Sequence, residues 1–258
     1  MSAMTKNTES VIAIEDLRIS FSGNEVLKGV SLDLKKEENL VVLGKSGTGK
    51  SVLIKCIVRL LKADSGSIKV FDEEVNGAKR EDLEEIRKKI GFLFQSGALY
   101  DSMTVKENLE FPLRRIKKEL SEEEISQKVQ EALENVGLPD SINKMPSELS
   151  GGMRKRISLA RTIIVDPAIM LYDEPTTGLD PVTSNEISML INDIQEKYKT
   201  SSIIITHDIE CVRTVADRII MLKEGEVYKV GTLQEFESDS DPYISSFFKS
   251  QSLKNQKQ

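Results

Sequence analysis

The most informative stretch of this sequence is Gly44-Lys45-Ser46-Gly47-Thr48-Gly49-Lys50-Ser51, which follows the pattern GxxxxGK[ST]. The five residues before it, 39–43, read NLVVL and predict a buried strand, and residues 49–62 carry apolar side chains at helical spacing. In such a context, glycines let successive backbone amides point inward around phosphate groups, and the start of the helix adds positive potential. The stretch therefore predicts a nucleoside phosphate site on an α/β sheet.

Two side chains of this loop have predictable tasks. Lys50 is expected to reach the β- and γ-phosphates of the nucleotide. Ser51 is expected to place its hydroxyl on a Mg²⁺ ion that is shared with phosphate oxygens and water. A glycine-rich turn without a ligand is the alternative interpretation, and the strand before the loop and the helix after it argue against that alternative.

The chain on both sides of the loop alternates between strand and helix patterns. Between residues 97 and 165 the strand patterns stop and helical patterns dominate. This order predicts an α/β fold with an inserted α-helical subdomain. The strand patterns lie at 11–21, 30–34, 65–71, 90–95, 168–173, 202–207 and 218–225, and a charged helix is expected at 79–89.

We expect a single domain over residues 1–258. Its α/β core comprises 1–96 and 166–235, its helical subdomain comprises 97–165, and its C-terminal tail comprises 236–258. The last residues, SLKNQKQ, are polar and are expected to fray. Within the subdomain, Ser121 and Glu124 predict a capping box at the start of a helix. Gly137 is a typical residue for the end of the same helix.

A pair of carboxylates follows another buried strand. Residues 169–172 are apolar and lead directly into Asp173 and Glu174, at the strand edge where α/β sheets bind ligands. Because side chains alternate along a strand, Asp173 can orient Mg²⁺ while Glu174 faces the attacking water as general base. Taken alone, such a pair is more often a solvated strand end, and the phosphate loop upstream favours the catalytic interpretation.

A second anion-binding helix start lies at Leu149-Ser150-Gly151-Gly152-Met153, which opens a helix that continues RKRISLARTII. Ser150 is expected to cap this helix, with glycine amides exposed behind it. One chain with two such helix starts and one carboxylate pair suggests that each helix start serves a different nucleotide.

With these motifs in this order, the chain resembles the ATP-binding cassette (ABC) family from about Ile12 to Gly231. The resemblance implies an α/β fold with a P-loop NTPase, RecA-like core, an N-terminal antiparallel β region and an inserted α-helical subdomain. It also implies an ATPase that binds ATP and Mg²⁺ and drives a membrane transporter. The family motifs are Phe21 as the adenine-stacking aromatic, the phosphate loop, Gln95, the LSGG sequence at 149–152, Asp173 with Glu174, Gly178-Leu179-Asp180, and His207.

The resemblance also implies roles for individual residues. Gln95 couples metal and water to the membrane partner, Asp180 signals across a dimer, and His207 touches the γ-phosphate. The implied catalytic residues are Glu174, His207 and Gln95, the implied metal ligands are Ser51, Gln95 and Asp173, and the second nucleotide contact comes from Ser150, Gly151, Gly152 and Asp180. His207 is the only histidine, and without the other motifs it would be an ordinary polar strand end.

The resemblance further implies a head-to-tail dimer, in which each nucleotide lies between Lys50 of one copy and Ser150 of the other. This sequence differs from the usual family pattern at two positions. Phe21 stands where many relatives have Tyr, and Met153 stands where most have Gln, which offers a polar contact.

LSGGM followed by RKR, together with FQSGALYDSMTVKENLEFPL at 94–113, is similar to the ATPases of Mla-type transporters. Those transporters move phospholipids together with an integral membrane permease and an MCE-domain protein. Ordinary core packing of a helical subdomain is the alternative interpretation of residues 97–113.

The composition limits the classes of binding partner and the cellular location that we expect. The 36 basic and 42 acidic residues give a net charge of -6. Because this charge creates no global positive field, we expect the chain not to bind nucleic acid. The N-terminus MSAMTKNTES lacks an apolar signal core, and no stretch is apolar enough to span a membrane. Cys56 and Cys211 suit a reducing cytosol. The expected location is the cytoplasmic face of the inner membrane, through the permease.

Two further functional classes stay open. A transport ATPase of the same architecture for amino acids, metals or lipoproteins differs from the lipid class only in residues 91–113 and 147–156. A non-transport cassette ATPase acting in DNA repair, chromosome structure or translation usually has a long coiled-coil insertion or two cassettes in one chain, and the sequence shows neither.

Overall fold

A computed structural model describes residues 9–252 of the chain. The chain divides into two compact units, one formed by Met1–Gly77 with Ser201–Gln258 and the other by Ala78–Thr200. Each unit is described by itself. The expected absence of a signal segment concerns residues that lie mostly outside the described part, as do all of the final SLKNQKQ residues except Ser252.

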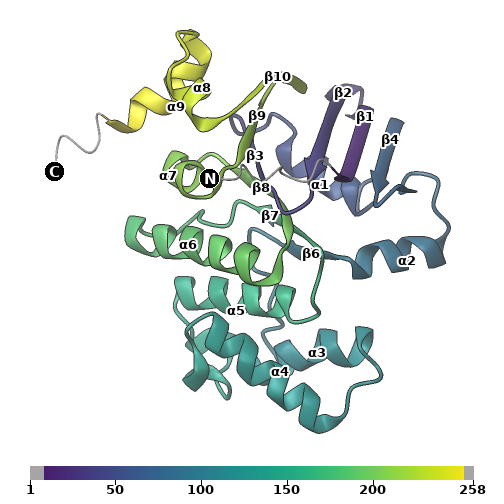
Figure 1. The fold of residues 1–258 in the computed structure, drawn as a ribbon, viewed down its shortest axis with the longest axis vertical. Helices are drawn as coiled ribbons and strands as arrows, with labels where there is room; N and C mark the ends of the chain where they lie inside the picture. The colour runs from purple at the N-terminus through teal and green to yellow at the C-terminus, as the bar shows by residue number, and fades with distance from the viewer. Residues whose placement is uncertain (1–8, 253–258) are drawn as a thin grey trace, which may run out of the picture. The chain divides into compact units, whose positions relative to one another are not determined.

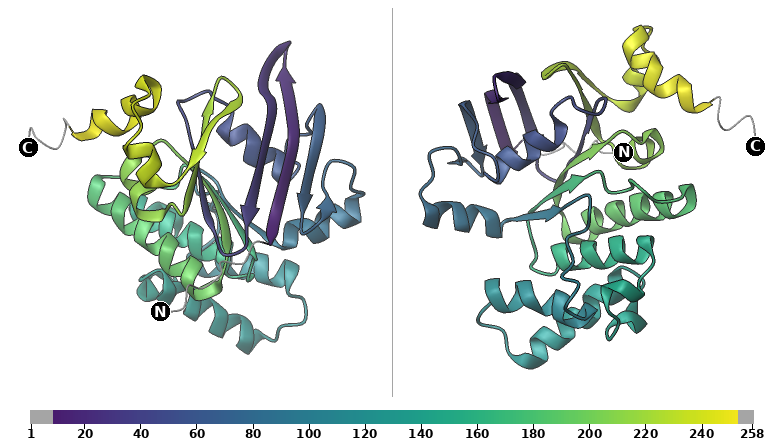
Figure 2. Two further views of the ribbon diagram at one scale, coloured as in Figure 1. Left: turned by 45° about the horizontal axis from the view of Figure 1, so that its top comes forward. Right: turned by 180° about the vertical axis from the view of Figure 1, so that it is seen from behind.

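The first unit contains the predicted N-terminal antiparallel sheet, with strand order β2-β1-β4-β5 (Figure 2, left). Phe21 pairs with Asn24 across a two-residue turn, Ser22-Gly23, in which both φ angles are positive, at 50° and 84°. This hairpin starts the second strand at Asn24, six residues before the expected 30–34 segment. The strands are β1 (Ser10–Phe21), β2 (Asn24–Lys35), β4 (Ser65–Val70) and β5 (Glu73–Glu74).

The same unit carries the strand that leads into the phosphate loop. β3 (Asn39–Leu43) runs parallel to β8 (Ser201–Thr206) on one side and to β9 (Arg218–Lys223) on the other. Every residue of β3 and β8 is buried, as expected for strands covered on both faces. Strand β10 (Glu226–Gly231), which is antiparallel to β9, and the helices α1 (Lys50–Ile57) and α7 (Ile209–Val215) complete this region.

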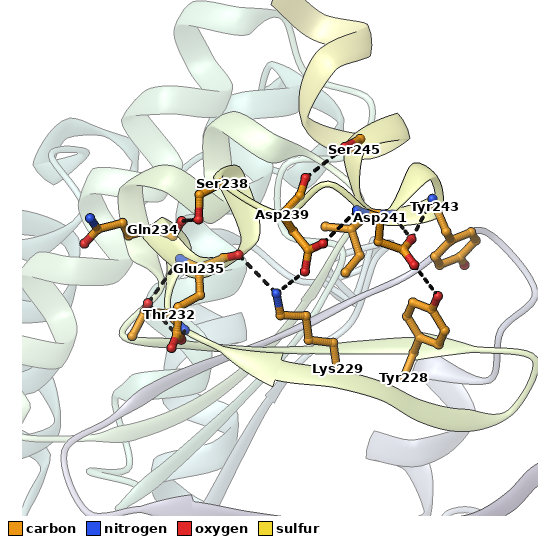
Figure 3. A network of polar contacts seen from close by, with 11 residues as sticks. Tyr228, Lys229, Thr232, Gln234, Glu235, Ser238, Asp239, Asp241, Tyr243 and Ser245 are labelled. Carbon is orange, nitrogen blue, oxygen red and sulfur yellow. Dashed lines mark hydrogen bonds and ion pairs between the residues drawn. The ribbon is translucent and has the colours of Figure 1, made fainter.

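The helix α8 (Leu233–Glu237) crosses the predicted start of the C-terminal tail at 236, and α9 (Pro242–Ser252) lies within the tail. A ladder of polar contacts joins these helices to β10 (Figure 3). The Tyr228 hydroxyl donates to Asp241 at 2.7 Å, and Lys229 forms an ion pair with Asp239. The Asp241 carboxylate also accepts from the Tyr243 amide at 2.7 Å. With the buried side chain of Phe236 beneath it, this segment is a packed part of the unit.

The second unit contains the parallel pair β6 (Ile90–Leu93) and β7 (Ile169–Asp173) together with the helices between and after them. Helices α3, α4 and α5 pack on one another, and α5 lies beside α6 (Figure 1). The helical elements are α2 (Arg80–Lys88), α3 (Val105–Ile116), α4 (Glu122–Asn135), α5 (Gly151–Ile163) and α6 (Pro181–Tyr198), with two 3₁₀ turns at Pro139–Ser141 and Pro146–Glu148.

The predicted helix ends in this unit are confirmed. Ser121 and Glu124 form a capping box at the start of α4, and Gly137 follows that helix with a φ of 70°. Ser150 caps α5 by accepting from the Met153 amide at 3.2 Å. Among residues 9–252, none of the helices combines the length and the apolar character needed to cross a membrane.

Candidate nucleotide site

The phosphate loop turns directly from β3 into α1, and two of its glycines are needed for different reasons. Gly49 has a φ of 95°, and a Cβ there would lie 2.6 Å from the Leu27 side chain and 3.1 Å from the Val26 carbonyl oxygen. Gly47 has a φ of 81° and nothing within 4 Å of a Cβ position. Gly49 therefore lets the loop pack on β2, while Gly47 bends it around open space.

The Lys50 ammonium lies inside the curve of this loop. Its Nζ donates to the Gly44 carbonyl at 2.7 Å and to the Lys45 carbonyl at 3.0 Å. Helix α1 has no side-chain cap and no acidic residue in its first turn. Backbone amides and one buried ammonium thus converge on the loop, which is the donor set that a polyphosphate requires.

His207 leaves the sheet at the same edge as the phosphate loop. Leu43 and Thr206 are paired in the parallel strands β3 and β8, so the residues that follow them, Gly44 and His207, emerge side by side in sequence register. His207 is exposed, and the next residue caps α7. Phe21, the expected adenine platform, ends β1 with 42% of its surface exposed, which leaves its ring accessible for stacking.

A contact that sequence reasoning missed joins the phosphate loop to the C-terminal helix α9. The Lys45 ammonium lies 5.1 Å from the centroid of the Tyr243 ring, which also receives Lys223 at 4.7 Å. Burial raises the pKa of the Tyr243 hydroxyl. Tyr243 follows Asp241 in the ladder that anchors α9 to β10 (Figure 3). No local pattern in the sequence pairs residues this far apart.

In the second unit, only the first residue of the carboxylate pair lies in the strand, although side-chain alternation along a strand was expected to separate the two acids. Asp173 is the last residue of β7 and is buried, whereas Glu174 has already left the strand with a φ of 52°. The Glu174 carboxylate accepts from the Thr177 hydroxyl at 3.1 Å. A left-handed turn, not strand alternation, therefore separates the two acids. Such backbone strain in a residue other than glycine is concentrated at functional sites.

Gln95 lies two residues after the end of β6 and is exposed. Its backbone carbonyl is contacted by a side chain of α5. The Lys155 Nζ donates to the Gln95 carbonyl at 2.5 Å. Burial lowers the pKa of Lys155, and the charges of Asp173 and Glu174 act in the opposite direction. Lys155 therefore lies within electrostatic range of both acids. Sequence reasoning missed Lys155, although it stands in the RKR run that follows the LSGG motif.

The start of α5 packs against the start of α6. A Cβ on Gly152 would lie 2.6 Å from the Thr183 side chain, so glycine is required there. Asp180 caps α6 by accepting from the Val182 amide at 3.1 Å and from the Thr183 amide at 3.0 Å. Hydrogen bonding to these groups and to the Thr183 hydroxyl lowers the pKa of Asp180. Asp180 therefore has a structural role at the helix end, and its role across a dimer stays a prediction.

Comparison with known proteins identifies the family. The family model described as ABC transporter matches residues 27–177, more than half of the chain. The chain belongs to the ABC transporter family. The match includes the phosphate loop, Gln95, the LSGG motif and the carboxylate pair, and it confirms the expected family.

Relatives of this ABC ATPase carry different substrate names. It is 40% identical over 236 residues to the probable ribonucleotide transport ATP-binding protein mkl of Mycobacterium leprae, covering 92% of this chain and 68% of the relative. It is 37% identical to the methionine import ATP-binding protein MetN of Rhizobium johnstonii, covering 87% of this chain and 61% of the relative. It is also 37% identical to the chloroplastic protein TRIGALACTOSYLDIACYLGLYCEROL 3 of Arabidopsis thaliana, covering 95% of this chain and 75% of the relative.

Solved structures confirm the fold class and the ATPase. A dimeric, post-hydrolysis state of the ATP-binding cassette MJ0796 bound to ADP and Pi matches with a TM-score of 0.78 and 32% identity, covering 86% of this chain and 98% of that one. The cbiO1 structure from Clostridium perfringens matches with a TM-score of 0.82 and 31% identity, covering 90% of this chain and 92% of that one. The chain is thus an ATP-hydrolysing ABC ATPase with the predicted α/β P-loop core.

Proposed function

We propose that this ABC ATPase powers the transport of phospholipid or a related lipid across the cell envelope. The observation that carries the proposal is the sequence at 94–113 with LSGGM and RKR, which is similar to Mla-type ATPases. One relative, which is named after the galactolipid trigalactosyldiacylglycerol, is 37% identical over 95% of this chain, and this similarity supports the proposal. The relatives named for ribonucleotide and methionine transport favour a second candidate, a transporter of small polar solutes.

ATP hydrolysis is proposed to use the residues in the following roles. The phosphate loop and Lys50 bind the phosphates, Glu174 takes the proton of the attacking water, and His207 contacts the γ-phosphate. Ser51, Gln95 and Asp173 offer hydroxyl, amide and carboxylate oxygens, the donor chemistry that suits Mg²⁺. When bound, Mg²⁺ supplies charge neutralisation on the phosphate oxygens. Phe21 stacks on the adenine.

The proposed assembly is a head-to-tail dimer of this chain. Each unit carries one of the two predicted anion-binding helix starts, with the N-cap residue Gly49 in the first unit and Ser150 in the second. In the dimer, Ser150, Gly151 and Gly152 of one copy meet the nucleotide on the phosphate loop of the other. The dimeric state of a solved relative supports this arrangement. We propose that the dimer binds an integral permease on the cytoplasmic face of the inner membrane, together with an MCE-domain protein.

The lipid proposal is tested by transport itself. The ATPase is purified with its permease and reconstituted in vesicles that contain a fluorescent phospholipid, and ATP is added. We expect ATP-dependent movement of the phospholipid and no stimulation of hydrolysis by ribonucleotides or methionine. Stimulation by one of those solutes, with no movement of lipid, would favour the second candidate instead.

The permease contact gives a further prediction about Tyr100 and Met103. Tyr100 is exposed, and its ring lies edge-on to the Phe111 ring, with 5.2 Å between the ring centroids. Met103 is half-buried in the same loop before α3. An exposed Tyr beside an adaptable Met suits a groove for a short helix of the permease. The double variant Tyr100→Ala with Met103→Asp is expected to lose permease co-purification and transport while ATP affinity stays normal.

The matched control for this prediction is Tyr100→Phe, which keeps the ring against Phe111 and should retain the permease. Co-purification from membranes and ATP binding by the isolated chain are measured in parallel. Normal permease recovery and normal transport in the double variant would exclude this surface as the docking site. A parallel loss of ATP binding would show that these side chains belong to the core of the chain itself.

A further inference from the structure

The backbone that carries Gln95 is held by one side of α5. Lys155 donates to the Gln95 carbonyl at 2.5 Å, and Arg161 donates to the Ala98 carbonyl at 2.8 Å. Between them, the Ser158 hydroxyl lies 2.6 Å from the position that a Cβ on Gly97 would take. Positions 155, 158 and 161 are three residues apart and therefore follow one side of the helix. We call this set of contacts the α5 clasp.

The segment held by the α5 clasp includes two consecutive residues with left-handed backbone conformations. Gly97 and Ala98 are consecutive residues with φ of 80° and 52°, and the second of them is not glycine. A left-handed conformation at alanine costs about 1 kcal/mol or more and persists where the surroundings enforce it. The Arg161 guanidinium, 4.8 Å from the centroid of the Tyr100 ring, holds the far end of the same segment.

Lys155 is the part of the clasp with the greatest electrostatic cost. Its residue surface is 7% exposed, and a buried ammonium is tolerated only where hydrogen bonds and opposite charges compensate for lost water. The Gln95 carbonyl and the nearby charges of Asp173 and Glu174 supply that compensation. The Lys155 ammonium therefore bonds the Gln95 backbone within range of the charges of Asp173, which ends β7, and of Glu174, which follows it, all within the second unit.

We propose that Lys155 is a positioning residue for ATP hydrolysis, which fixes the Gln95 backbone relative to Asp173 and Glu174. The inference rests on the roles proposed above for Gln95 and Glu174. Because α5 begins at Ser150, the clasp also makes the LSGG helix start and the Gln95 segment parts of one connected element.

The test compares Lys155→Met with Lys155→Arg. Methionine keeps an unbranched side chain of four of the five heavy atoms but cannot donate, so kcat is expected to fall by about 10- to 100-fold, the effect of misplacing a catalytic group by about 1 Å. ATP affinity measured by calorimetry is expected to stay within about twofold, because the phosphate loop is unchanged. Arginine restores a donor and is expected to recover most of the lost kcat.

Hydrogen exchange shows whether the effect is confined to the Gln95 segment, while the fall in kcat at unchanged ATP affinity is the readout that a merely structural role would not move. In Lys155→Met, the amides of residues 96–100 are expected to exchange faster, while the amides of α4 keep the wild-type rate. Arg156→Met is the matched control. Arg156 also donates to a backbone carbonyl, that of Val136 at 3.1 Å, and pairs with Glu186, so it tests a similar contact on the same helix away from Gln95.

Two results would overturn the proposal. One is a Lys155→Met variant with wild-type kcat. The other is a fall in kcat that Arg156→Met reproduces, or that leaves exchange at 96–100 unchanged. Failure of the proposed role of Glu174 is recognised separately, since Glu174→Gln would then hydrolyse ATP normally in the same assay, whatever the exchange data show for the clasp.

Discussion

Glu174→Gln is expected to slow ATP hydrolysis by about 10²-fold or more, because a positioned general base contributes roughly 10² to 10⁴ to a rate. The substitution is close to isosteric. Glutamine keeps an oxygen that can accept from the Thr177 hydroxyl, which lies 3.1 Å from the Glu174 carboxylate, so the left-handed turn at this residue has the same side-chain partner. What is lost is the ability to take a proton from water. ATP binding is expected to be unchanged, since the phosphate loop keeps all its donors.

The measurement combines turnover with the state of association. Trapped ATP is expected to hold a dimer of the Glu174→Gln chain, seen by sedimentation with Mg-ATP. Glu123→Gln, an exposed carboxylate in the first turn of α4, is the matched control and is expected to turn over as wild type. If sedimentation showed only monomer and Glu174→Gln turned over near the wild-type rate, the assignment of Glu174 as general base would be wrong.

Features that depend on neighbouring residues were predictable from the sequence. The caps at Ser121 and Ser150 are local hydrogen bonds between a side chain and an amide three residues on, so the residue type at one position fixes the geometry. The apolar runs at 40–43 in β3 and 203–205 in β8 are typical of a buried parallel strand. The family motifs are equally local, and each lies next to a strand or helix end as expected.

Some local features were present in the sequence but not used. Thr232 and Glu235 form a capping box that starts α8, and Asp180-Pro181 starts α6 with a cap and a proline at the first helical position. These patterns predict helices at the end of the core segment 166–235 and after the Gly178-Leu179-Asp180 motif, where the sequence interpretation named none. The Phe21 to Asn24 hairpin likewise explains why β2 is longer than its apolar run.

The remaining features were not predictable, because they depend on how distant segments pack. Nothing near Lys155 in the sequence indicates that its ammonium reaches the Gln95 carbonyl, sixty positions away. The contact between Lys45 and Tyr243 joins the phosphate loop to a helix near the other end of the chain. The left-handed turn at Glu174 overrides the alternation of side chains that a longer strand would have. Each is set by tertiary packing, which propensity and periodicity do not report.

Lys50→Ala is expected to lose most of the affinity for ATP, by about tenfold to a hundredfold, because hydrogen bonds to charged groups each contribute about 1.5–3 kcal/mol. The phosphates would lose their main side-chain counter-charge. The structure adds a second reason. Lys50 donates to the carbonyls of Gly44 and Lys45, so its ammonium also holds together the two ends of the loop before a nucleotide arrives.

Calorimetric titration with ATP measures this effect directly. Lys55→Ala is the matched control, because it removes a lysine from the last turn of the same helix and away from the loop, and it is expected to bind ATP as wild type. Lys50→Arg separates the two reasons, since arginine keeps the charge but cannot reproduce the compact contact of an ammonium with both carbonyls. An intermediate affinity is therefore expected for Lys50→Arg. Unchanged ATP affinity in Lys50→Ala would disprove the assignment of residues 44–51 as the phosphate site.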